Sequence, residues 1–142
     1  MTTQPYRPTI RTQQDLETMW RTLMEPLGFG SHSVWLAFIR ADGRLTPHLT
    51  QVQDDGPVVG EAEREGLAHV LRHLRDDLDP GGRWAFLRSR PGQGGTTDLD
   101  RDWARMLYDA GRAADVAVEV VHLATDTHLV PIPLDDVAAL AS

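Results

Sequence analysis

An apolar strand that runs into a glycine-rich loop, which then opens a helix, constrains the fold of this chain more than any other stretch. The apolar run over 84–87 is followed by Arg88 and Arg90, then by the loop Pro-Gly-Gln-Gly-Gly, and then by a helical pattern that begins near Thr97 and Asp100. In α/β domains such a junction often holds a site, because helix-start N–H groups and loop backbone converge there. These four polar side chains are therefore the first candidates for a function.

The clearest amphipathic helix lies near the start of the chain. Thr12 is followed three residues later by Asp15, a pattern typical of a capping box. Apolar side chains then recur at helical spacing, at Leu16, Met19, Trp20, Leu23, Met24 and Leu27. Gly28 and Gly30 are expected to end this helix. The periodicity indicates one buried face, and the stripe of methionine and tryptophan is interpreted as core.

Two further helices are predicted. One spans 60–78, with a buried stripe of leucine and valine and with charged residues on its other faces. The other follows the glycine-rich loop and has Thr97 or Asp98 as its cap. Residues 135–141 are expected to form a helical turn or to fray.

Strand-like runs alternate with these helices. The nearly continuous apolar run over 34–39 predicts a central strand covered on both faces. Asp42-Gly43 is a hairpin signal, and residues 44–53 return as a strand in which Pro47 favours an edge or a bulge. Two more strands are predicted, over 116–123 and 128–132. The order α-β-β-α-β-α-β-β indicates an α/β (α+β) fold, a single three-layer domain with a mixed sheet and helices on both faces.

The composition limits the classes of function. The 142 residues suit one domain, predicted over 11–132, with a disordered lead-in over 1–10 and a tail over 133–142. The sequence has no cysteine, which excludes disulfides and thiolate metal sites and fits a cytoplasmic location. A net charge of −7 argues against nucleic-acid binding, and no apolar run is long enough for a membrane helix.

Several local patterns are compatible with chemistry, and each has a simpler explanation. His69 and His73 have the i, i+4 spacing of a metal site, but their phase places them on a solvated face. In Ser31-His32-Ser33, adjacent residues of a strand point to opposite faces, so the histidine is badly placed as a base for either serine. The glycine-rich loop lacks the Gly-Lys-Ser/Thr of a P-loop. Its backbone N–H groups, with the two arginines beside them, still suit an anion.

The order of these pieces resembles the JAB1/MPN/Mov34 metalloenzyme family, and within it the bacterial RadC-like branch. The pieces that carry the resemblance are the opening 10–16, the strand and hairpin 34–45, the helix 61–73, and the helix 104–112 with the strand 116–123. Arg88-Ser-Arg-Pro-Gly lies where the family has His-x-His-Pro-x-Gly, and Thr97-Asp-Leu-Asp100 lies where it has Ser-x-x-Asp. The match spans residues 10–132, with one residue missing in the 88–100 loop. It implies a JAB-like, cytidine-deaminase-like fold.

The resemblance also implies that zinc chemistry is lost. Active family members bind zinc through two histidines and an aspartate, with a glutamate as general base and a serine that helps to hold the tetrahedral intermediate. The two histidines correspond to Arg88 and Arg90, which offer a metal no lone pair and repel a dication. The serine corresponds to Thr97, the aspartate to Asp100, and the base approximately to His32 or, after a one-residue slip, to a neighbouring serine. One carboxylate beside two arginines is a salt-bridge arrangement, so neither a metal nor another cofactor is expected.

Three functional hypotheses follow. The first is a catalytically inactive domain that binds an anionic ligand, an acidic peptide or a protein partner at the vestigial cleft; its binding residues are Arg88, Arg90, Gly94, Gly95, Thr97 and Asp100. The second is a hydrolase with a rebuilt site, in which His32 is the base, the two arginines hold an anionic substrate, and Thr97 and Asp100 are further catalytic candidates. The third is an assembly module whose sheet edge or apolar patch mediates a homodimer or another complex. Neither a nucleic acid nor a membrane is expected as a partner.

Overall fold

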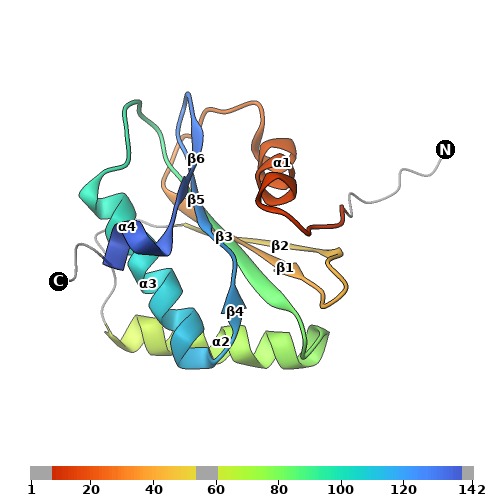
Figure 1. Cartoon of the computed structure of the whole chain (residues 1–142). Coiled ribbons are helices and arrows are strands. Elements are labelled where there is room, and N and C mark those ends of the chain that lie inside the picture. Colours follow the sequence, from red (N-terminus) through yellow and green to blue (C-terminus); the bar gives the residue numbers. More distant parts are fainter. Residues whose placement is uncertain (1–7, 54–60, 139–142) are drawn as a thin grey trace.

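The computed structural model describes residues 8–53 and 61–138, in which four helices cover one mixed sheet (Figure 1). The helices are α1 (Gln13–Met24), α2 (Glu61–Leu78), α3 (Asp98–Ala114) and α4 (Leu134–Ala138). The strands are β1 (Ser33–Ile39), β2 (Leu45–Gln53), β3 (Arg83–Ser89), β4 (Ala117–Val118), β5 (Val121–Ala124) and β6 (Leu129–Ile132). In this part of the chain the strand order is β2-β1-β3-β5-β6, with β4 paired to β3. The predicted α/β fold, with helices on both faces of a mixed sheet, is confirmed.

The three layers come from the alternation of side chains along the central strands. In β3, Trp84 and Phe86 belong to the apolar cluster on the side of α2 and α3, whereas Ala85 and Leu87 belong to the cluster on the side of α1 (Figure 1). Both sets are buried, which explains why the strand is a continuous apolar run rather than an alternating one. On the α1 side the cluster is completed by residues that include Leu16, Met19 and Trp20.

Helix α1 begins where the sequence predicts but ends earlier. The side chain of Thr12 accepts a hydrogen bond from the backbone N–H of Asp15, and Asp15 in turn accepts from the N–H of Thr12, so the capping box is confirmed. The prediction that Gly28 and Gly30 end the helix is wrong, since Met24 is the last helical residue. The cause is Pro26, which has no N–H and drives Glu25 to an extended backbone with ψ of 144°.

The predicted hairpin between the first two strands is confirmed. β1 and β2 are antiparallel, and the backbone N–H of Arg40 donates to the carbonyl of Arg44 across the Asp42-Gly43 turn. β2 lies at one edge of the sheet, and its register with β1 shifts between Ala37 and Ile39, opposite Pro47. The predicted edge position of Pro47 is therefore confirmed, and the proline lies at a shift in register, because it has no N–H to donate to a neighbouring strand.

The single strand predicted over 116–123 is two strands. The pairs Trp84 with Val118 and Leu87 with His122 enclose three steps of β3 but four steps of the partner, so one extra residue interrupts the ladder between β4 and β5. The hydroxyl of Tyr108 bridges the next ladder, because it accepts from the N–H of Val121 at 2.9 Å and donates to the carbonyl of Ile132 at 2.8 Å.

The packed region is wider than the predicted limits of 11 and 132. Ile10 is buried against the α1 side of the sheet, and the carbonyl of Pro8 accepts from the N–H of Leu45. At the other end, Val137 of α4 is buried in the cluster on the α2 and α3 side. Residues 1–7 of the predicted lead-in and 139–142 of the predicted tail lie outside the described residues. Among the described residues, no helix is both long enough and apolar enough to cross a membrane.

Candidate functional site

The fold brings the end of β3, the start of β1 and the start of α3 to one place. β1 pairs antiparallel with β3 so that Ser33 lies opposite Ser89, which sets His32 beside the arginines that end β3. The N-cap of α3 is Thr97, whose hydroxyl accepts from the N–H of Asp100 at 3.2 Å. The capping box thus turns Asp100 back toward the end of β3.

Asp100 is held by both arginines at once. The Nε atom of Arg88 donates to Oδ1 at 2.9 Å, and the Nε atom of Arg90 donates to the same oxygen at 2.8 Å. The Nη2 atom of Arg90 donates to Oδ2 at 2.8 Å, and the backbone N–H of Thr97 reaches that oxygen at 2.9 Å. Each carboxylate oxygen therefore accepts more than one charge-assisted or backbone hydrogen bond, an arrangement typical of a fixed ion pair.

The ion cluster formed by Arg88, Arg90 and Asp100 lies inside the molecule, and this burial affects the pKa values of its groups. Arg88 and Asp100 have 0% of their surface exposed, and Arg90 has 7%. Burial by itself raises the pKa of Asp100, but hydrogen bonds from Arg90, Thr97 and Arg88 outweigh it and hold this pKa at about 2. The hydrogen bond to Asp100 raises the pKa of Arg90 in turn. Asp100 is consequently ionised across the physiological range.

Arg88 also ties the cluster to β1 and to α3. Its Nη2 atom lies 3.1 Å from Nδ1 of His32, and its guanidinium carbon lies 5.6 Å from the ring centre of Trp103. A guanidinium can only donate, so Nδ1 of His32 is the acceptor, and the neutral imidazole carries its proton on Nε2. The lone pair that a general base would use is engaged by Arg88, which counts against His32 in that role.

The glycine-rich loop over 91–95 is anchored at its sides and exposed at its tip. Gly92 has a φ of 103° and Gly94 a φ of 99°, conformations that glycine adopts without a steric cost. Asp126 accepts from the N–H of Gly92 at 2.8 Å and from the N–H of Phe29 at 3.1 Å. The Nη2 atom of Arg90 donates to the carbonyl of Gly95 at 3.2 Å.

Sequence reasoning missed Asp126 and Trp103 as parts of this site. Asp126 lies in the tight turn between β5 and β6, and the backbone hydrogen bond from Gly92, followed by that from Phe29, lowers its pKa. The Thr-Asp-Thr-His sequence of that turn is a signal for an aspartate that accepts from backbone N–H groups, but nothing in it identifies the loop that donates. Trp103 lies on the buried face of α3, and no local pattern in the sequence indicates its contact with a cation.

The donor set does not suit a metal ion. The two guanidinium groups have no lone pair to offer, and they already occupy both oxygens of Asp100. In the described part of the chain, no group of three histidine, aspartate or glutamate side chains is arranged to hold a metal. His69 and His73 lie exposed on α2, as their phase predicts, and His73 pairs with Asp77 at 3.6 Å.

Comparison of the chain with protein-family models, with curated proteins and with solved structures found no match. The resemblance to the JAB1/MPN/Mov34 family therefore stays a prediction from the sequence.

Proposed function

We propose that this chain is a catalytically inactive, JAB/RadC-like domain that acts by binding. The observation that carries the proposal is the double engagement of Asp100: both of its oxygens are bound by Arg88 and Arg90 inside the protein. Of the residues that the resemblance assigns to zinc, only this aspartate is retained, and its lone pairs point at cations that belong to the chain. The cluster orders the loop and the start of α3 rather than performing chemistry.

The ligand that fits the exposed tip of the loop is an anionic group, either a small anion or the carboxylates of an acidic peptide. Within the described residues, the N–H groups of Gly94 and Gly95 donate to no protein acceptor, and both residues are exposed. Free backbone N–H groups in a glycine-rich loop before a helix attract anions, because the N-terminal end of the helix adds a positive partial charge. Arg90 lies directly behind them, bonded to the carbonyl of Gly95.

The test is a titration of the ¹⁵N-labelled protein with inorganic phosphate and with a short peptide that ends in two aspartates, followed by amide chemical shifts. We expect saturable shifts at Gly94 and Gly95. Gln93→Glu places a negative charge on the exposed loop and should weaken binding about tenfold, a loss of roughly 1.4 kcal/mol. Ala113→Glu, which adds the same charge at the exposed far end of α3, is the matched control and should bind as the wild type does.

Two results would contradict this assignment of the ligand. One is the absence of saturable shifts in the loop with either anion. The other is an equal loss of affinity in both variants, because an effect of overall charge does not depend on where the charge is placed.

A further inference from the structure

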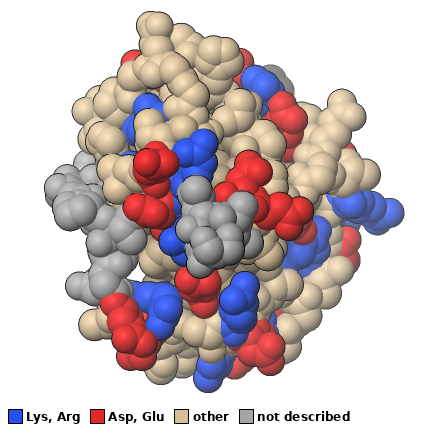
Figure 2. Space-filling view, turned by 60° about the vertical axis from the view of Figure 1, so that its left-hand side comes forward, with Lys and Arg blue, Asp and Glu red and all other residues tan. Residues whose placement is uncertain are grey.

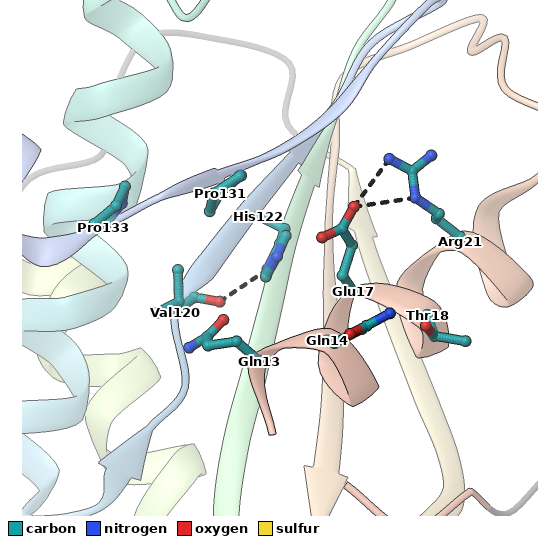
Figure 3. Close-up of a pocket in the computed structure, with 9 residues that line it drawn as sticks. All are labelled: Gln13, Gln14, Glu17, Thr18, Arg21, Val120, His122, Pro131 and Pro133. Carbon is teal, nitrogen blue, oxygen red and sulfur yellow. Dashed lines mark hydrogen bonds and ion pairs between the residues drawn. The ribbon is translucent and has the colours of Figure 1, made fainter. Parts of the chain in front are cut away.

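A separate groove lies on the α1 side of the sheet, between α1 and the β5–β6 edge (Figure 3). Its volume is about 790 Å³, within the range of small-molecule sites. One wall is the polar face of α1, with Gln13, Glu17 and Arg21, and the other wall is made by Pro131 and Pro133. The imidazole of His122 lies between the two walls (Figure 3).

His122 presents a hydrogen-bond acceptor to this groove. The residue is only 2% exposed, and its Nδ1 atom lies 3.1 Å from the carbonyl oxygen of Val120. A carbonyl can only accept, so the proton resides on Nδ1, and the neutral ring has a lone pair on Nε2. Burial lowers the pKa of His122, which favours this neutral form. Among the described residues, Nε2 has no hydrogen-bond partner.

Glu17 presents a second acceptor while its charge is balanced. The Nε and Nη2 atoms of Arg21 both donate to Oε1 of Glu17, at 3.2 Å and 3.0 Å (Figure 3). In the described part of the chain, Oε2 accepts no hydrogen bond. The groove therefore offers two acceptor atoms, one on a neutral imidazole and one on a carboxylate that is paired with an arginine. An apolar wall of proline rings faces them.

We propose that this groove binds an uncharged polyhydroxy compound of the size of a mono- or disaccharide. Its hydroxyl groups donate to Nε2 of His122 and Oε2 of Glu17, and its C–H face packs against Pro131 and Pro133. An anion lacks the donors that these two atoms require. A cation gains little, because Arg21 already neutralises the carboxylate. Because His122 is only 2% exposed, a donor matched to its Nε2 atom is worth more than a donor matched to an exposed acceptor, whereas the Glu17 side chain is 42% exposed and contributes less.

The experiment uses D-glucose, maltose and myo-inositol as probes. Long-range ¹H–¹⁵N correlation spectra report the Nε2 atom of His122 directly, and saturation transfer reports the bound sugar. We expect at least one probe to shift the Nε2 signal saturably. Glu17→Ala should weaken its binding about tenfold, the loss of one hydrogen bond to a charged acceptor. Glu65→Ala, at an exposed position of α2, is the control and should leave the affinity unchanged.

The proposal fails if none of the three polyols moves the Nε2 signal, or if Glu17→Ala binds them as tightly as the wild type. Gluconate tests the requirement for an uncharged ligand, since tighter binding of this anion than of glucose would contradict it. His122→Phe removes the acceptor altogether and should abolish saturation transfer. Because that variant alters a buried position, its folding is checked by the dispersion of its amide spectrum, and Glu17→Ala decides the matter if it unfolds.

Discussion

The groups that surround Asp100 give this residue a structural role. The carboxylate has no exposed surface, and two guanidinium groups with a backbone N–H surround it. A buried ion pair does not by itself make a protein stable, because removing charges from water is costly. Removing the carboxylate is costly as well, because the two guanidinium groups then lose the charge-assisted hydrogen bonds that it accepts inside the protein.

Asp100→Asn should therefore lower the free energy of unfolding by about 3–5 kcal/mol at pH 7. The folded pKa of Asp100 is about 2 and its ordinary value is 3.8, so this stabilisation is complete above the ordinary value and is lost as the pH falls toward 2. The gap between the wild type and the variant should accordingly shrink by roughly 2 kcal/mol between pH 5 and pH 2. Urea unfolding at several pH values measures this gap.

Asp98→Asn is the control for that series. Asp98 is two positions earlier on α3, its side chain is 92% exposed, and it pairs with Arg101 at 3.2 Å. A surface pair of this kind contributes at most about 1 kcal/mol. A loss in Asp98→Asn as large as in Asp100→Asn would show that burial of the ion cluster is not what makes Asp100 important.

At the scale of elements, two helical glycines have opposite roles. A Cβ atom on Gly111 of α3 would lie 2.3 Å from Cγ2 of Val118, because β4 passes directly under the helix, whereas a Cβ atom on Gly66 of α2 would meet nothing within 4 Å. Replacing Gly111 by alanine therefore tests the close contact between α3 and β4, whereas replacing Gly66 tests only the intrinsic preference of a helix for alanine.

Gly111→Ala should destabilise the protein by about 1–3 kcal/mol through this clash. Gly66→Ala should instead stabilise it by about 0.5–1 kcal/mol, because alanine loses less backbone entropy in a helix. Thermal and urea unfolding of the two variants give the comparison. Equal effects of the same sign would mean that α3 does not pack on β4 as closely as described.

Much of the arrangement of elements could be predicted because local signals and tertiary packing agree. The capping box at Thr12, the Asp42-Gly43 turn and the cap at Thr97 are all local, and each occurs where the sequence indicates. The end of α1 was misjudged because apolar periodicity continues to Leu27, although Pro26 cannot continue a helix. The break between β4 and β5 depends on pairing with β3, which no local pattern encodes.

In the candidate site, the pairing of the two arginines with the aspartate could also be predicted from the sequence. Arg88, Arg90 and Asp100 lie within one stretch of sequence, and charge complementarity alone suggests that they pair. The groove at His122 was not foreseen, because it combines α1 with β5 and β6, elements about a hundred residues apart in the chain. A lone histidine in a strand gives no signal of the carbonyl that fixes its tautomer.

At the scale of the whole molecule, the ion cluster and the groove at His122 lie on opposite sides of the sheet. The ion cluster lies on the side of α3, where Arg88 contacts Trp103, and the groove of His122 lies on the side of α1. Acidic and basic side chains are interspersed on the face seen in Figure 2, and the chain as a whole has a net charge of −7. That face therefore has no extended basic surface of the kind that binds a phosphate backbone.

The zinc content of the purified wild-type chain, equilibrated with zinc and then passed through gel filtration, tests the inactive-domain proposal most directly. With both oxygens of Asp100 bound by arginine, we predict much less than one zinc ion per chain by elemental mass spectrometry, and no change in Asp100→Asn. One zinc ion per chain that is lost in Asp100→Asn, yet kept when the exposed His69 and His73 are replaced by alanine, would contradict the proposal.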